Sequence, residues 1–242
     1  TAARAVARFV RHANIPRTIE FMDHTAICLA EDFLHLGLPV DAGALLLMEV
    51  DGKQAEIKTL VRDLEDLSRR LGAVSVSVAE TEEQAASLWQ ARKALSPALF
   101  KLAPHKINED IVVPRSRIPD LVAKIDELRQ RTGLIMVAFG HAGDGNIHFN
   151  IMLDKSDPAA LKKAHASVET LFDYTLHLGG TISGEHGIGI TKAPYLQKEL
   201  GSDSIRLMRR IKQAFDPLGL LNPGKIFPER IVADPVAAPH SG

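Results

Sequence analysis

The feature that most constrains the fold is a pair of short apolar runs joined by a glycine-rich turn. The runs cover residues 134–139 and 147–153, and both are rich in β-prone side chains. Runs of this length bounded by Gly and Asp are typical of neighbouring strands. Asp144-Gly145 between them is a strong signal for a two-residue type I′ turn. The sequence therefore predicts a β-hairpin.

This hairpin brings two histidines together. With Asp144-Gly145 as the loop, His141 pairs directly with His148, and opposed Cβ atoms of an antiparallel pair lie about 5 Å apart. Both imidazoles can then converge on one ion. Asn150 lies two residues beyond His148, so it shares the same face of the strand.

A second polar cluster lies in a glycine-rich segment over residues 179–189. Glu185 and His186 are adjacent there, and an irregular backbone can direct neighbouring side chains into one pocket. Two histidines and one carboxylate leave coordination positions open, which suits catalytic zinc or redox-active iron or manganese. One of the adjacent pair can bind the metal while the other exchanges protons, and histidine, with a reference pKa of about 6.5, suits proton exchange.

Each of these features has a plainer interpretation. Histidines that flank a hairpin are commonly half-buried polar residues, and the run over residues 184–189 is also typical of a loop ahead of a helix. The metal interpretation is strengthened because the candidate residues are close together. Four titratable residues lie beside apolar segments, where such groups are costly unless they are used.

Charge and composition exclude several functions. A net charge of −1 over 242 residues and a pI near 6.8 give no electrostatic field for nucleic acid. The single cysteine, Cys28, cannot form an internal disulfide, which fits a reducing compartment. No apolar run approaches the roughly 20 residues of a membrane-spanning helix. We therefore expect a cytoplasmic protein, with peripheral attachment to a membrane left open.

The order of apolar patterns predicts an α+β fold. Helices are expected at residues 2–13, 18–36, 53–71, 80–100, 119–132, 158–178, 194–200 and 202–215. Strands are expected at residues 44–50 and 74–78, in the hairpin and from residue 110 to 113. The pattern predicts two ferredoxin-like antiparallel β/α halves followed by a small C-terminal helical segment, with a stop and turn at Asn222-Pro223-Gly224.

These elements divide the chain into four segments. Residues 1–40 form a helical lead-in, 41–190 a substrate- and metal-binding α+β domain, 191–229 the C-terminal helical segment and 230–242 a loose tail. The chain starts without an initiator Met or a signal-peptide pattern, so we expect an excised fragment.

Several motifs occur together in this chain. They are Gly-His-Ala-Gly-Asp-Gly-Asn-Ile-His at 140–148, Ser-Gly-Glu-His-Gly-Ile-Gly at 183–189 with Lys192 after it, and Leu-Asn-Pro-Gly-Lys-Ile-Phe at 221–227. Softer matches lie at 16–23, 88–92 and 109–114. With these motifs the chain resembles the C-terminal half of the FAD-linked oxidases of the vanillyl-alcohol oxidase superfamily. It most resembles the group of D-lactate dehydrogenase, the glycolate oxidase flavoprotein subunit and D-2-hydroxyglutarate dehydrogenase.

The resemblance implies a metal site and a base. His141, His148 and Glu185 would hold a divalent metal, which we expect to be zinc, manganese or iron. His186 would be the catalytic base.

The resemblance also implies a substrate site. Arg92 would meet the substrate carboxylate through its planar guanidinium, helped by Ser96 and Asn150. Ser96 stands where a threonine is expected in the 2-hydroxyglutarate branch. A second basic group expected in this region falls on Asn108, with Lys106 nearby as the candidate.

FAD is the second implied cofactor. The chain contains no Gly-x-Gly-x-x-Gly motif and none of the glycine-rich pyrophosphate loops that the family places in a separate N-terminal domain. We therefore expect FAD to be held mainly by a domain absent from this chain, and the fragment alone to be inert. Asn222 and Lys225 are candidates for contacts with the flavin.

The sequence as a whole predicts the substrate- and metal-binding half of an FAD-dependent D-2-hydroxy-acid dehydrogenase or oxidase. Its substrate would be an acid of the D-lactate, glycolate or 2-hydroxyglutarate type, with hydride transfer to flavin and an electron acceptor beyond it. The alternatives on ligand type are a metal hydrolase, a non-haem iron oxygenase and a non-catalytic module that binds a metal and an acid. A homodimer is also considered.

Overall fold

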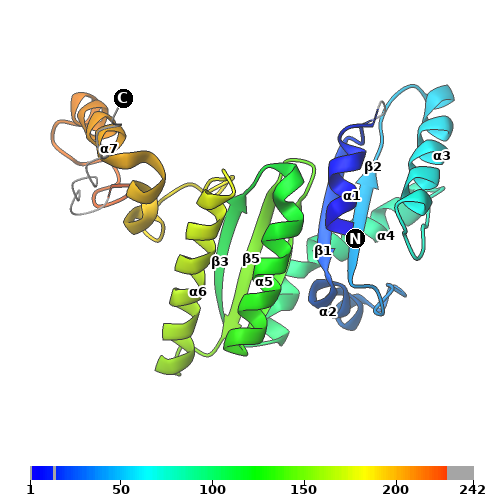
Figure 1. Cartoon of the computed structure of the whole chain (residues 1–242), viewed down its shortest axis with the longest axis horizontal. Coiled ribbons are helices and arrows are strands. Elements are labelled where there is room, and N and C mark those ends of the chain that lie inside the picture. The colour runs from blue at the N-terminus through cyan, green and yellow to red at the C-terminus, as the bar shows by residue number, and fades with distance from the viewer. Residues whose placement is uncertain (1, 13–14, 228–242) are drawn as a thin grey trace, which may run out of the picture.

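A computed structural model describes residues 2–12 and 15–227, and its centre is one five-stranded antiparallel sheet (Figure 1). The strands are β1 (Thr18–Asp23), β2 (Ala44–Glu49), β3 (His105–Val112), β4 (Ile135–His141) and β5 (Asn146–Leu153), in the spatial order β2-β1-β4-β5-β3. The predicted α+β class is confirmed.

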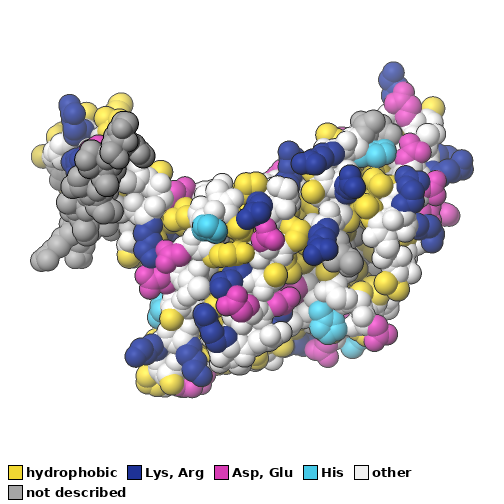
Figure 2. Space-filling view, in the orientation of Figure 1, with side chains coloured by type: hydrophobic (Ala, Val, Ile, Leu, Met, Phe, Trp, Pro, Cys, Tyr) yellow, Lys and Arg dark blue, Asp and Glu magenta, His cyan; other side chains and the backbone are white. Residues whose placement is uncertain are grey.

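Helices cover both faces of this sheet. The helices are α1 (Ala2–Phe9), α2 (His24–Leu34), α3 (Gln54–Arg70), α4 (Glu82–Ala98), α5 (Ile118–Thr132), α6 (Pro158–His177) and α7 (Leu196–Phe215). Helices α1, α5 and α6 pack on one face, and α2 and α4 pack on the other. Helix α7 extends away from the sheet beyond α6 (Figure 1). On the side of the molecule that Figure 2 shows, acidic and basic side chains are mixed rather than separated into fields of one sign.

Alternation along the strands gives the two faces different chemistry. Ile19 and Phe21 of β1 and Phe149 of β5 belong to the large apolar core under α1, α5 and α6. On each strand, the side chains next to these residues in sequence point to the opposite face, because successive side chains of a strand alternate. On that face a smaller apolar cluster, which includes Met22 and Phe139, packs under α2 and α4. The remaining part of this face is polar and carries the candidate site.

The second ferredoxin-like half is visible in the order β3, α5, β4, β5 and α6. An isolated antiparallel bridge between Val112 and Thr181 adds a short pairing on the outer edge of β3. Both halves share one continuous sheet, joined where β1 pairs with β4. The segment boundaries expected at residues 40, 190 and 229 stay predictions.

The hairpin of β4 and β5 is confirmed, but its predicted register is wrong by two residues. His141 pairs with Asn146, and His148 pairs with Phe139, around a four-residue turn. Tertiary hydrogen bonds hold this longer turn, since the N–H of Gly143 donates to the carbonyl of Ile19 and the carbonyl of Gly145 accepts from Val113. The pairing of the turn with its neighbours outweighs the local preference for a two-residue loop.

The helix predicted at residues 18–36 is present only over His24–Leu34, and the helical lead-in expected over residues 1–40 contains a strand before it. Residues Thr18–Asp23 form β1, which lies inside the sheet between β2 and β4. The helix begins only at His24, because the side chain of Asp23 accepts the N–H of Ala26 at 2.8 Å as an N-cap. Helix α1 ends at Phe9, before the predicted end at residue 13, which lies outside the described residues.

The strand predicted at residues 74–78 is also wrong. These residues have no strand assignment, and Val74 is 98% exposed. An alternating pattern forms a strand only where a partner strand is available. The strand expected at 110–113 is present but begins earlier, at His105.

The two helices predicted at residues 194–200 and 202–215 are confirmed. Residues 196–215 are helical with a break at Gly201, whose φ is 72°, so the two predicted helices meet there. Asn222, with a φ of 48°, begins the predicted turn. The tail over residues 230–242 lies outside the described residues. Within the described ranges, no helix has both the length and the apolar character needed to cross a membrane.

Candidate functional site

The polar part of the sheet is built from two cross-strand pairs. Glu20 on β1 lies opposite His141 on β4, and Asp110 on β3 lies opposite His148 on β5. His148 is in turn opposite Phe139, which is two residues from His141. All five side chains therefore lie on the same face of the sheet.

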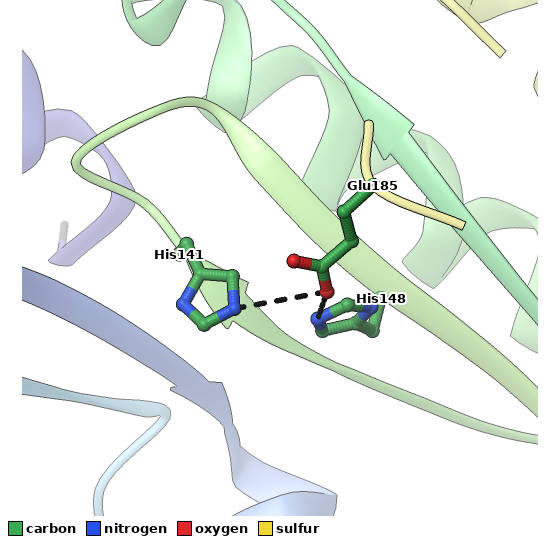
Figure 3. Close-up of side chains that lie close together, drawn as sticks. All are labelled: His141, His148 and Glu185. Atoms are coloured by element: carbon green, nitrogen blue, oxygen red, sulfur yellow. Dashed lines mark ion pairs between the residues drawn. The ribbon is translucent and has the colours of Figure 1, made fainter. Parts of the chain in front are cut away.

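Two histidines and one glutamate converge above this face (Figure 3). Nε2 of His148 lies 3.2 Å from Oε1 of Glu185, and Nε2 of His141 lies 3.9 Å from the same oxygen. One ligand atom from each residue lies within 4.8 Å of the other two. Ligand atoms about 2.0–2.2 Å from one tetrahedral zinc ion lie about 3.3–3.6 Å apart, so the two contacts of the half-exposed Glu185 are close to the separations that one ion needs.

His148 is held in its neutral form. Burial first, and the positive charge of Arg92 second, lower its pKa to about 4. Its ring stacks on that of His186 with a centroid distance of 5.3 Å, and the ring of Phe139 lies 5.8 Å away. A neutral imidazole is the form that binds a metal, so His148 needs no deprotonation near neutral pH.

His141 belongs to a charged network with Glu20 and Arg92. Nδ1 of His141 is 2.6 Å from Oε1 of Glu20, and Nε of Arg92 donates to Oε2 at 2.7 Å. Burial raises the pKa of Glu20, but the hydrogen bond with His141 and the charge of Arg92 outweigh burial, so the pKa is lowered overall. The same hydrogen bond raises the pKa of His141.

Asp110 organises the loop that carries Glu185 and His186. Its carboxylate accepts three consecutive backbone N–H groups, from Gly184 at 2.8 Å, from Glu185 at 2.5 Å and from His186 at 2.9 Å. The ammonium group of the buried Lys192 also donates to it. Burial opposes the ionised form, but these donors dominate and lower the pKa of Asp110 to about 2.

The loop can approach this closely because residue 184 is glycine. A Cβ on Gly184 would lie 2.7 Å from the side chain of Asn146, which is closer than packed atoms allow. The glycine motif therefore has a steric reason. It lets the loop pass directly over the end of the hairpin.

His186 faces both Asp110 and the metal ligands. Its Nδ1 lies 3.4 Å from Oδ1 of Asp110, and its Nε2 lies 3.9 Å from Oε1 of Glu185. The carboxylate on one side favours a proton on Nδ1, which leaves Nε2 with a free lone pair. The geometry suits a base with its accepting nitrogen toward the ligand cluster.

The residues predicted to bind substrate lie on α4 and along the same sheet face. Arg92 is mostly buried, with its guanidinium carbon 4.8 Å from the ring centre of Phe139. Ser96 is one turn further along α4 and accepts a hydrogen bond from Lys106 on β3 at 3.1 Å. Asn150 is fully buried and accepts from Asn108.

Asn222 and Lys225 lie apart from this cluster, in the C-terminal segment. Both are exposed, and Lys225 donates to the side chain of Asn222 at 3.2 Å. The segment is joined to the glycine-rich loop by a hydrogen bond from the N–H of Ile226 to the carbonyl of Gly189 at 2.7 Å.

Sequence reasoning missed Glu20 and Asp110 as members of the site. Both lie in segments with softer motif matches, residues 16–23 and 109–114. Glu20 could not be placed beside the histidines because its segment was predicted as a helix and not as a strand of the same sheet. Asp110 was placed in a strand, but the strand that faces it could not be known from spacing alone.

Comparison with known proteins identifies the family of this chain. The family described as FAD linked oxidases, C-terminal domain, matches residues 1–226. Glycolate oxidase subunit GlcD of Bacillus subtilis is 38% identical over 237 residues, which is 96% of this chain and 50% of that protein. D-lactate dehydrogenase of Anaerostipes hadrus is 32% identical over 229 residues, 91% of this chain and 48% of that protein. The chain thus spans about half the length of these relatives.

Solved structures share the fold at low sequence identity. p-Cresol methylhydroxylase with substrate bound aligns with a TM-score of 0.66 at 14% identity, covering 93% of this chain and 48% of that one. 4-Ethylphenol oxidase from Gulosibacter chungangensis aligns with a TM-score of 0.62 at 18% identity, covering 88% of this chain and 48% of that one.

Proposed function

The chain belongs to the family of FAD linked oxidases, C-terminal domain, and from this membership we propose that it is the substrate- and metal-binding half of an FAD-dependent D-2-hydroxy-acid dehydrogenase or oxidase. The observation that carries the proposal is the convergence of His141, His148 and Glu185 beside His186. Relatives named glycolate oxidase and D-lactate dehydrogenase support a small 2-hydroxy acid as the substrate class.

The donor set fits a divalent metal with open positions. Two imidazole nitrogens and one carboxylate oxygen suit zinc, manganese or iron, and three protein ligands leave room for a substrate. His148 is neutral, and the hydrogen bond of His141 to Glu20 leaves Nε2 of His141 directed toward Glu185. FAD is proposed to be held mainly by residues outside this chain, with Asn222 and Lys225 as candidate contacts.

When bound, the metal would act as a Lewis acid on the substrate oxygen and the flavin would accept a hydride. His186 would take the hydroxyl proton at Nε2, while Asp110 next to Nδ1 stabilises the imidazolium that results. A general base of this kind contributes about 10²–10⁴ to the rate.

Side chains on α4, β3 and β5 would orient the substrate. Arg92 would pair with the substrate carboxylate, and Ser96, Lys106 and Asn150 would line the space around the rest of the acid. Burial of Arg92 excludes water from its guanidinium, which strengthens any ion pair that it makes.

The test is reduction of flavin by substrate in the full-length protein. Under anaerobic conditions, glycolate, D-lactate or D-2-hydroxyglutarate should bleach the flavin absorbance, and one of the three should do so fastest. The 242-residue chain with added FAD should show no bleaching. L-Lactate and L-2-hydroxyglutarate serve as matched controls for the two chiral acids.

Two outcomes would contradict the proposal. If no D-2-hydroxy acid reduces the flavin while the protein hydrolyses esters or amides with bound metal, the site is that of a metal hydrolase. Metal and acid binding without turnover in the full-length protein would indicate a binding module instead.

A further inference from the structure

The carboxylate of Glu20 uses both of its oxygens to join two parts of the site. Oε1 lies 2.6 Å from Nδ1 of His141, and Oε2 accepts from Nε of Arg92 at 2.7 Å. Glu20 is only 4% exposed and lies on β1, which has a strand on each side. The carboxylate is therefore fixed by the sheet as well as by its two partners.

This arrangement determines which nitrogen of His141 can bind a metal. A carboxylate cannot donate, so the hydrogen bond requires the proton to lie on Nδ1 of His141. Nε2, which faces Glu185 at 3.9 Å, is then the nitrogen that carries the lone pair. Carboxylate partners of this kind orient metal-binding imidazoles and raise their basicity.

The same carboxylate also determines the orientation of Arg92. Because the bond to Glu20 uses Nε, the two terminal nitrogens of the guanidinium keep their donors for a ligand. The ring of Phe139, 4.8 Å from the guanidinium carbon, limits the group on a second side. Glu20 thus links the group that would hold the substrate carboxylate to a ligand of the metal.

We infer that Glu20 is a positioning residue that fixes His141 for metal binding and Arg92 for substrate binding through one carboxylate. The inference rests on the proposed function. The alternative is that Glu20 only neutralises the buried Arg92. Its contact with His141 would then have no effect on metal binding. The nitrogen of His141 that binds zinc distinguishes the two, because neutralising Arg92 does not require a proton on Nδ1 of the imidazole.

The experiment measures zinc binding by the metal-free 242-residue chain, in competition with a chromophoric chelator. Glu20→Gln keeps the size of the side chain and removes its charge, and we expect zinc affinity to fall about 10–100-fold, as for other outer-shell partners of metal-binding histidines. The matched control is Glu49→Gln on the neighbouring strand β2. Glu49 also accepts from α4, through Trp89 at 3.0 Å, and this variant should keep wild-type affinity.

A second measurement does not depend on a variant that folds. In the zinc-loaded wild type, nitrogen-15 NMR should show a proton on Nδ1 of His141 and zinc on Nε2. Zinc on Nδ1, or wild-type zinc affinity in a folded Glu20→Gln variant, would overturn the role of Glu20 and leave the metal site intact. Because a site of nitrogen and oxygen ligands binds zinc more tightly than manganese or ferrous iron, failure of the wild type to bind zinc would instead overturn the metal site of the proposed function, and this inference with it.

Discussion

Asp110 and His186 are joined twice, through the backbone and through the side chain. The N–H of His186 donates to Oδ2 of Asp110 at 2.9 Å, and Nδ1 of His186 lies 3.4 Å from Oδ1. A fully buried carboxylate on β3 therefore controls both the path of the loop and the ring that it carries.

Replacing Asp110 with Asn should destabilise the chain. The substitution leaves the buried ammonium of Lys192 without its closest counter-charge, and breaking a buried ion pair on one side costs about 3–5 kcal/mol. The free energy of unfolding in urea measures the effect. Asp203→Asn, in the exposed pair with Arg206, should change it by no more than about 0.5 kcal/mol. Equal small effects of both variants would show that Asp110 does not hold the loop.

The stability of the metal-free chain should fall as the pH is lowered from 6.5 to about 4. The pKa of His148 is lowered from 6.5 to about 4 in the folded chain, so the unfolded chain binds the proton more tightly across this interval. The full effect is about 3 kcal/mol. His141, whose pKa is raised, acts in the opposite direction.

The difference between wild type and His148→Gln isolates this contribution. The measurement is the free energy of unfolding with a chelator present, at several pH values. The variant should lose the part of the pH dependence that His148 supplies. Parallel curves for the two proteins would contradict the lowered pKa.

His186→Ala in the full-length protein should reduce turnover about 10²–10⁴-fold while metal content stays close to wild type. The reason is that His186 would supply a base without being a metal ligand. Metal analysis and flavin reduction rates measure the two properties separately. His177→Ala, an exposed histidine on α6, is the control and should keep both. Loss of metal in step with loss of turnover would make His186 a ligand.

Two phenylalanines should respond very differently to truncation. Phe149 is fully buried in the core under α1, α5 and α6, so Phe149→Ala should cost about 3–5 kcal/mol of unfolding free energy. Phe215 at the end of α7 is 84% exposed, and Phe215→Ala should cost less than about 0.5 kcal/mol in this chain. Thermal or urea unfolding compares them directly.

The hairpin shows why the site could be predicted although the register was wrong. Side chains alternate with a period of two, so a shift of two residues keeps His141 and His148 on the same face, whereas a shift of one would have separated them. Their rings are 5.5 Å apart as diagonal neighbours. The prediction that the two histidines share a face is therefore correct, although the prediction that they pair directly is wrong.

The other errors arose because a single sequence does not show which strands pair in the folded chain. Residues 18–23 could be assigned to a helix because nothing local shows that β2 and β4 lie on either side of them. Residues 74–78 have a strand pattern without a partner strand. In both cases tertiary pairing decided the structure, and local propensity did not.

The placement of β1 between β2 and β4 has a consequence for the order of folding. Glu20 comes near the start of the chain and Glu185 near its end, yet both contact His141. Such contacts close very large loops, which form more slowly than local hairpins. We expect β4 and β5 to pair early and the site to be completed last. A metal ion would then bind only chains that have finished folding, and its uptake would report the final step of maturation.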